Sequence, residues 1–366
     1  MSAAISFSRS VIVWQKRFGR HDLPWQENRD PYRIWVSEVM LQQTQVATVI
    51  PYFRTFIAEF PDLEKLANAP LDRVMQLWSG LGYYSRARNL HRCAQEVMNR
   101  YGGKFPREAV QLEALPGIGR STAAAIAALA FGIPGAILDG NVKRVIARHF
   151  GIEGYAGDSK VQSKLWAVAQ REVPVTGIQA YTQGLMDIGA TVCLRSKPNC
   201  PVCPVSRSCV ALGGGRISEL PAAKPRAAVP QRFVLLLLIA RGPEILLLKR
   251  PPAGIWGGLW SLPELPLEQA EFDAQNCGPQ TLAQVSSWVA GQGLAIESQT
   301  LLAGFEHRFT HFRLGILPLQ ISASSASGLS RRVAEPASLW LPAQEVSGAA
   351  LPKPVKDLLL RQFAGR

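Results

Sequence analysis

Four of the six cysteines in this 366-residue chain fall within one 17-residue segment. They are Cys193, Cys200, Cys203 and Cys209, with six, two and five residues between neighbours. Thiolates this close together in an intracellular chain are metal ligands more often than disulfide partners. Zinc ribbons present two short-spaced cysteine pairs and this segment has one, so the spacing favours a [4Fe–4S] cluster and leaves zinc as the alternative.

Two carboxyl side chains lie in contexts that could make them catalytic. Glu38 is flanked by apolar residues in WVSEVMLQQTQV, which makes a buried acid with a raised pKa plausible. Asp139 lies in LDGNVKRV, just before a helical pattern. Carboxyl groups in unlike environments can divide proton donation and charge stabilisation between them. Each also has an ordinary interpretation, since Glu38 could be an exposed helix residue and Asp139 a helix N-cap.

A glycine-containing turn directly precedes an alanine-rich segment in LPGIGRSTAAAIAALA, which starts at Leu115. Gly117 and Gly119 would let the backbone approach a phosphate, and the start of the following helix would offer free N–H groups and a positive dipole end. Such a turn positions nucleic acid without reading its sequence. Taken alone, most Pro-Gly-x-Gly helix starts are simple turns.

The charge of the chain suits a polyanionic partner. The net charge is +13, and residues 1–225 hold 27 basic against 17 acidic side chains. A basic excess concentrated in one part of a chain points to nucleic acid, although a solvated basic surface gives the same count. No apolar run approaches the ~20 residues of a membrane span, and the short apolar core from Val11 to Trp14 does not fit a secretory signal. We therefore expect a cytoplasmic protein with no membrane partner.

The elements that must position these groups fall into two parts. Apolar residues recur at three- and four-residue spacing through residues 1–212, which predicts an all-α domain. Residues 213–231 are rich in Gly, Ala and Pro and are interpreted as a linker. Residues 232–366 begin with RFVLLLLIARGPEILLLKR, two apolar strands around a turn, which predicts a smaller α+β domain.

The combination of these motifs resembles the helix-hairpin-helix DNA glycosylases related to endonuclease III. The resemblance is carried by the cysteine spacing, by LPGIG, and by the acidic residue twenty positions after Gly119. It covers residues 1 to about 212 and implies a helix-hairpin-helix at about 112–128 and a [4Fe–4S] cluster in the loop 193–209. It also implies that Asp139 faces the sugar whose glycosidic bond is cut, and that Asn141 hydrogen-bonds in that site.

Two positions indicate a branch of this superfamily. Bifunctional members carry a lysine nucleophile directly after the Gly-Arg of the turn, where this chain has Ser121, which cannot form a Schiff base. The segment around Glu38 closely resembles the one that carries the general acid in adenine DNA glycosylases. The resemblance therefore implies that Glu38 protonates adenine while Asp139 stabilises the oxocarbenium-like sugar.

The resemblance implies further contacts to DNA, some of them in the gap that the flipped adenine leaves in the base stack. Gln42, four residues beyond Glu38, is expected on the same helical face and, with Tyr83, in that gap. The remaining expected contacts are the backbone at Gly117 and Gly119, the hydroxyl of Ser121, and an adenine pocket lined by Trp25, Gln26 and Gln183.

Residues 232–366 resemble the Nudix-like domain of the same branch. The acidic run that binds magnesium in active Nudix hydrolases is missing after Gly258, so we expect binding and no hydrolysis there. Phe309, Thr310 and His311 resemble a Phe-Ser-His loop that recognises 8-oxoguanine, with threonine replacing serine. Both hydroxyls can donate and accept hydrogen bonds.

We therefore predict a monofunctional DNA glycosylase of base excision repair that flips out and hydrolytically removes adenine mispaired with 8-oxoguanine or guanine. The alternative is a bifunctional endonuclease III-like glycosylase and AP lyase. A non-catalytic damage binder would need neither Glu38 nor Asp139. The expected partner is double-stranded DNA containing these mispairs, bound by a monomer that associates with the bacterial nucleoid while on DNA.

Overall fold

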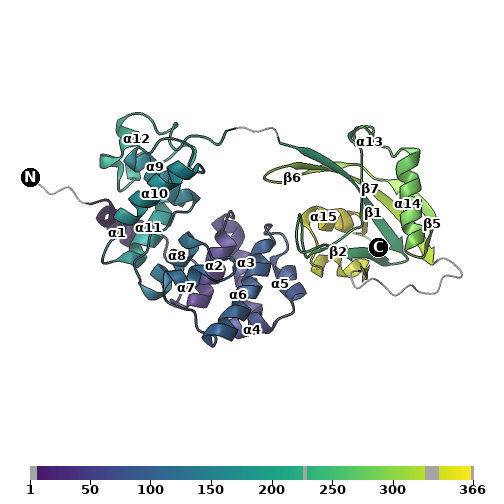
Figure 1. The fold of residues 1–366 in the computed structure, drawn as a ribbon, viewed down its shortest axis with the longest axis horizontal. Coiled ribbons are helices and arrows are strands. Elements are labelled where there is room, and N and C mark those ends of the chain that lie inside the picture. The colour runs from purple at the N-terminus through teal and green to yellow at the C-terminus, as the bar shows by residue number, and fades with distance from the viewer. Residues whose placement is uncertain (1–5, 226–228, 326–337, 364–366) are drawn as a thin grey trace, which may run out of the picture. The chain divides into compact units, whose positions relative to one another are not determined.

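The computed structural model describes residues 6–225, 229–325 and 338–363, so residues 226–228 of the predicted linker lie outside the described part. The described residues form two compact units. The first contains the residues up to 69 together with 86–225, and the second contains 70–85 together with those from 229 onward. Figure 1 shows helices in the purple-to-teal part of the chain and a sheet in the green-to-yellow part. Within the described residues, no helix is both long enough and apolar enough to cross a membrane.

The first unit consists of helices, as the sequence predicted (Figure 1). Their bounds are α1 Phe7–Phe18, α2 Pro31–Leu41, α3 Val46–Glu59, α4 Leu63–Asn68, α6 Ser85–Tyr101, α7 Ala109–Glu113, α8 Arg120–Phe131, α9 Gly140–Phe150, α10 Ser159–Arg171, α11 Ile178–Asp187 and α12 Val210–Gly213, with a π-helical turn at Ile188–Val192 and 3₁₀ turns at Cys200–Val202 and Ser206–Ser208. The helix α5 Leu71–Trp78 belongs to the second unit.

Aspartate side chains start several of these helices. Asp30 accepts the N–H of Tyr32 at the start of α2, where Pro31 takes the first helical position. Asp139 and Asp158 similarly cap α9 and α10. A side-chain acceptor at this place satisfies N–H groups that have no partner within the helix, which fixes where the helix begins.

The pair α7 and α8 forms the predicted helix-hairpin-helix. Gly117 has φ +79°, and a Cβ there would lie 2.7 Å from the Cβ of Asn89, so both conformation and space require glycine. Ala124, Ala125 and Ala128 of α8 are buried. Their small side chains let α8 pack closely into the core that α1, α9 and α11 share.

The start of the predicted linker packs on the helical unit. Leu220 is buried, and its carbonyl oxygen accepts the Nε–H of Arg148 at 2.8 Å. Ala222 forms an isolated parallel bridge with Tyr155. The chain therefore leaves this unit after Ala222, later than the composition of residues 213–231 suggested.

The second unit contains an eight-stranded mixed sheet in its described part. Five strands follow the order β3-β2-β1-β7-β5, while β4 pairs with β1, β6 with β7 and β8 with β2. The strands are β1 Gln231–Arg241, β2 Glu244–Lys249, β3 Trp260–Ser261, β4 Glu264–Pro266, β5 Leu294–Leu301, β6 Phe305–Arg308, β7 Arg313–Ser325 and β8 Ser338–Pro342. The helices are α13 Gln269–Asp273, α14 Pro279–Gly291 and α15 Lys353–Phe363, with a 3₁₀ segment at Ala343–Gly348.

The two strands predicted in RFVLLLLIARGPEILLLKR are β1 and its antiparallel neighbour β2. The continuous apolar run in β1 reflects burial on both faces, because successive residues from Leu235 to Ile239 are all buried, and β1 also pairs in parallel with β7. Val285 and Val289 of α14 pack with Leu235 and Leu317 from the sheet in one buried cluster. This arrangement confirms the predicted α+β class of the C-terminal part.

Candidate active site

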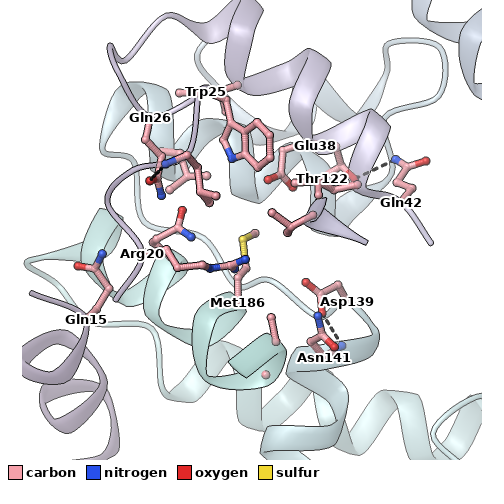
Figure 2. A pocket seen from close by; sticks show the side chains of 18 of the residues that line it. Gln15, Arg20, Trp25, Gln26, Glu38, Gln42, Thr122, Asp139, Asn141 and Met186 are labelled. Carbon is pink, nitrogen blue, oxygen red and sulfur yellow. Dashed lines mark hydrogen bonds between the residues drawn. The ribbon is translucent and has the colours of Figure 1, made fainter. Parts of the chain in front are cut away.

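The helical unit contains a cavity of about 1300 Å³ that gathers residues from distant parts of the sequence. Its walls come from the segment after α1, from α2 and the residues that follow it, from the starts of α8 and α9, and from α11. Figure 2 shows Arg20, Trp25, Glu38, Asp139 and Asn141 around the same space. This cavity is therefore the candidate active site.

Glu38 lies on α2 and lines this cavity. Its neighbours Val36, Val39 and Met40 are buried in the core, which leaves the carboxyl group on the cavity side (Figure 2). Burial, and to a lesser extent the negative charge of Asp139, raise the pKa of Glu38 to about 8. A carboxyl group with this pKa is protonated at neutral pH and can donate a proton.

Asp139 combines both interpretations of its sequence context, because it caps α9 and also lines the cavity. Its Oδ1 accepts the N–H groups of Asn141 at 2.6 Å and Val142 at 2.9 Å. Burial raises the pKa of Asp139, whereas those two N–H groups and the charges of Arg144 and Lys143 oppose the rise. Burial is the largest of these effects, so the pKa of Asp139 is raised overall. The negative charge of Asp139 in turn raises the pKa of Glu38, which makes Asp139 the group of the pair that loses its proton first.

Asn141 is held by Arg144, a residue that sequence reasoning missed. Arg144 Nη2 donates to Asn141 Oδ1 at 2.9 Å and to the carbonyl of Gly189 at 2.7 Å, and Nε donates to the carbonyl of Cys193 at 2.7 Å. Its position three residues after Asn141, on the same face of α9, is the signal that could have identified it.

Ser121 sits in the first turn of α8 and lines the cavity. Its Oγ accepts the N–H of Leu138 at 2.9 Å, which ties the start of α8 to the residue before Asp139. Gly119 occupies the N-cap position without a side-chain acceptor, so the first N–H groups of α8 keep no side-chain partner at that cap. The turn can therefore bind an anion through its backbone.

Gln42 is the C-cap residue of α2 and lies just past the helix on which its spacing from Glu38 placed it. The helix α2 ends at Leu41, and Gln42 follows with φ −57° and ψ 109°. The buried guanidinium of Arg86 accounts for the break, because Nη1 donates to the carbonyls of Val39, Met40 and Gln42 at 2.7–2.9 Å. Gln42 still lines the cavity, with its Nε2 3.5 Å from Thr122 Oγ1 (Figure 2).

The residues expected to form the adenine pocket all line this cavity. Trp25 and Gln183 are buried, and Gln26 Oε1 accepts the N–H of Leu23 at 3.3 Å. Arg20, which sequence reasoning also missed, adds a cation to the same wall (Figure 2).

The remaining predicted contact residues lie in the second unit. Tyr83 is exposed and has φ +48° in the segment between α5 and α6. Phe309, Thr310 and His311 form the turn of the hairpin between β6 and β7, where the ring of Phe309 stacks on that of Phe312 with centroids 4.5 Å apart. Thr310 and His311 are exposed at this turn, as a recognition loop requires.

The four clustered cysteines, Cys193, Cys200, Cys203 and Cys209, line one small pocket in the helical unit. Burial, together with the charges of the other three thiols, raises the pKa of Cys203 to about 11. Arg148 Nη1 donates to Cys193 Sγ at 3.4 Å. Across residues 6–225, 229–325 and 338–363, no set of three or more His, Cys, Asp or Glu side chains is arranged to hold a metal ion. The four thiols share this one pocket.

Comparison with known proteins connects this site to a family. Residues 36–171 match the HhH-GPD superfamily of base excision DNA repair proteins, and residues 234–361 match the NUDIX domain. The chain is 35% identical over 353 residues to the adenine DNA glycosylase of Buchnera aphidicola from Acyrthosiphon pisum, with 96% of each chain covered. It is 33% identical over 415 residues to the human adenine DNA glycosylase, with 99% of this chain and 74% of the human protein covered.

A similar fold occurs among solved structures. The structure of a thermostable thymine-DNA glycosylase matches 57% of this chain and 95% of its own, with a TM-score of 0.51 and 31% sequence identity.

Proposed function

Because this chain belongs to the adenine DNA glycosylase family of base excision repair, we propose that it hydrolytically removes adenine mispaired with 8-oxoguanine or guanine. The observation that carries this proposal is one cavity that holds a protonated carboxyl group, Glu38, and a capped carboxylate, Asp139. Breaking an N-glycosidic bond needs these two groups, one to protonate the leaving base and one to stabilise the positive charge on the sugar.

The reaction starts with an adenine flipped out of the duplex into the cavity, since the C1′–N9 bond is out of reach inside a base stack. Glu38 gives its proton to adenine, at N7, and the electron pair of the C1′–N9 bond leaves with the base. The sugar becomes an oxocarbenium-like cation, which Asp139 stabilises. Water then adds to C1′, and the ionised Glu38 takes a proton from it, which restores the acid and leaves an abasic site.

Strand cleavage is not part of this proposal. A lyase needs an amine that attacks C1′ and holds the sugar as a Schiff base. Ser121 occupies the position that the resemblance assigns to that amine, and its hydroxyl already accepts the N–H of Leu138. These facts support a monofunctional glycosylase, which we propose acts as a monomer.

We further propose that the turn Phe309–Thr310–His311 recognises 8-oxoguanine. Its exposed position between β6 and β7 and the hydrogen-bonding groups of Thr310 and His311 support this assignment. The stacking of the Phe309 ring on the Phe312 ring holds the two ends of the turn together.

We also propose that Cys193, Cys200, Cys203 and Cys209 hold one [4Fe–4S] cluster. The gathering of four thiols at one pocket fits this group, and the Arg148 guanidinium beside Cys193 suits an anionic cluster. When bound, the cluster would tie together the segment that follows α11, and no step of base release uses it. We expect four irons and four acid-labile sulfides per chain. Both should be lost in Cys203→Ser and kept in Cys277→Ser. One zinc per chain would contradict the assignment.

The function is tested with duplexes containing A:8-oxoguanine, A:G, A:T and thymine glycol, each analysed with and without hot alkali. We expect strand breaks at adenine in the two mispairs only, and only after alkali. Breaks without alkali would favour the bifunctional lyase, and breaks at thymine glycol would favour a glycosylase for oxidised pyrimidines. Binding without any base release would indicate a damage binder.

A further inference from the structure

The last residue of α11, Asp187, has an ionisable side chain that the proposed mechanism leaves unused. Asp187 is fully buried. Its Oδ1 accepts a hydrogen bond from Arg20 Nε at 2.7 Å and lies 2.7 Å from Nη2 of the same guanidinium. Its Oδ2 accepts the backbone N–H of Arg20 at 3.0 Å. A buried carboxylate held by this many donors fixes both the backbone and the side chain of Arg20.

The same carboxylate also holds Gln183, one helical turn earlier on α11. Gln183 Nε2 donates to Asp187 Oδ1 at 2.9 Å. An ionised carboxylate only accepts hydrogen bonds, so it selects the amide orientation of Gln183 in which nitrogen faces Asp187. The carbonyl oxygen Oε1 of Gln183 is then the part of the amide left to accept a hydrogen bond from a ligand.

Arg20 and Gln183 line the catalytic cavity, while Asp187 lies behind them. In Figure 2 the Arg20 side chain runs along the cavity beside Met186 and below Trp25. Arg20 Nη1 makes no hydrogen bond within the described residues, so it can donate into the cavity. One wall of the cavity thus presents a fixed donor and a fixed acceptor.

This donor and acceptor pair matches one edge of adenine. On its Watson–Crick edge adenine presents the N6 amino group, which donates, next to ring nitrogen N1, which accepts, and this leaves N7 free for the proton from Glu38. A purine with a carbonyl at C6, such as hypoxanthine or guanine, presents an acceptor where adenine has its donor. The Gln183 oxygen would then face another acceptor, which leaves buried polar groups unpaired and costs binding.

We propose that Asp187 is a positioning residue that sets the hydrogen-bonding polarity of this wall, and that it thereby selects adenine over purines carrying a 6-carbonyl group. The inference rests on the proposed function, because it names the selectivity of the same cavity. Asp187 acts through Arg20 and Gln183 and touches neither the base nor the sugar.

The test compares single-turnover release of adenine, unsubstituted purine and hypoxanthine, each opposite 8-oxoguanine, by the full chain and by Asp187→Asn. The variant keeps the size of the side chain but removes the charge and adds an NH₂ donor, which frees the Gln183 amide to turn over. We expect the ratio of adenine to hypoxanthine release to fall at least about tenfold in Asp187→Asn, with binding of uncleavable 2′-fluoro-adenosine duplex changed less. The matched control is Asp62→Asn, at the N-cap of α4 outside the cavity, which should leave the ratio unchanged.

Equal loss of all three rates in Asp187→Asn, with the ratio unchanged, would show that Asp187 only maintains the fold. Asp187→Glu keeps the charge and should recover more discrimination than Asp187→Asn. If Asp187→Asn does not fold, as thermal melting would show, the test uses the unmodified protein alone and compares its release rates for the three bases. Hypoxanthine released as fast as adenine by the full chain would overturn the proposal. Failure of the full chain to release adenine at all would instead overturn the proposed function.

Discussion

Glu38 lies on α2 and Asp139 caps α9, yet they line one cavity, and the charge of Asp139 contributes to the raised pKa of Glu38. Two carboxyl groups that interact in this way do not ionise independently. Burial raises the pKa of both groups, but the helix start and cations around Asp139 oppose that rise, and the charge of Asp139 raises the pKa of Glu38 to about 8. We propose on this basis that Glu38 is the acid and Asp139 the charge stabiliser.

Replacement of Glu38 by glutamine should abolish proton donation while keeping size and polarity. Loss of a general acid typically lowers a rate ~10²–10⁴-fold, and we expect adenine release to fall within that range. Binding of a mispaired duplex should change little, because the variant removes no cation. Single-turnover kinetics and duplex titration measure the two effects. Glu64→Gln, on an exposed position of α4, is the control, and near-normal release by Glu38→Gln would refute the role of Glu38.

The rate of base release should depend on pH through the Glu38 proton. With a pKa of about 8, the acid is protonated at neutral pH, and the fraction able to donate falls as pH rises through that value. Single-turnover rates of the full chain should therefore decline above about pH 8 in a profile governed by one proton. A rate that stays constant between pH 7 and pH 9.5 would contradict a raised pKa in the complex with DNA.

The same raised pKa makes a prediction about folding stability. Between the ordinary glutamate pKa of about 4.5 and the folded value of about 8, the folded chain keeps a proton that the unfolded chain releases. Stability from this group is therefore fully present below the ordinary value and is lost as pH rises towards about 8, at up to about 1.4 kcal/mol per pH unit. Glu38→Gln lacks this dependence. The difference between its melting temperature and that of the unmodified protein should therefore shift in favour of the variant from pH 5 to pH 8. A difference independent of pH would show that the burial of Glu38 has no such effect.

Asp139 has two roles that a conservative variant can separate. Asparagine is as good an N-cap as aspartate, so Asp139→Asn should keep α9 and cost less than about 1 kcal/mol of stability. It removes the negative charge that stabilises the sugar cation, so adenine release should fall at least ~10²-fold. Thermal melting and single-turnover kinetics measure the two. Asp158→Asn is a matched control, since Asp158 caps α10 through the N–H groups of Lys160 and Val161 in the same way. Equal rate losses in both variants would mean that only capping matters.

The turn between β6 and β7 should influence the choice of the base opposite adenine. Thr310→Ala removes a hydroxyl from the exposed tip while leaving the stack of Phe309 on Phe312. One lost hydrogen-bonding group costs about 1–3 kcal/mol, so the preference for A:8-oxoguanine over A:G should fall ~5–150-fold. Competition between the two duplexes measures it, with Thr300→Ala on β5 as the control. An unchanged preference would place 8-oxoguanine recognition elsewhere.

The sequence was most informative where a function depends on neighbouring residues. Cysteine spacing, the LPGIG turn and the strand pair in RFVLLLLIARGPEILLLKR are local patterns, and the cysteines share one pocket while the turn and strands have the expected form. The end of α2 was missed for a non-local reason. Arg86, far along the chain, donates to the carbonyl groups at the end of that helix, so α2 ends at Leu41 and Gln42 follows as its C-cap residue.

The sequence by itself determined which chemical groups are present, including a glutamate, an aspartate, four clustered thiols and a serine in place of an amine. Only the tertiary structure decided which of them meet. Residues 101 positions apart became the two carboxyl groups of one cavity, and Asp187 joined Arg20 across 167 positions. The pKa of Glu38 also depends on the packing of several helices, since removal from water is a property of everything that surrounds a group. Spacing along a chain reports neighbours within one element, whereas burial and charge pairing arise only when separate elements pack together.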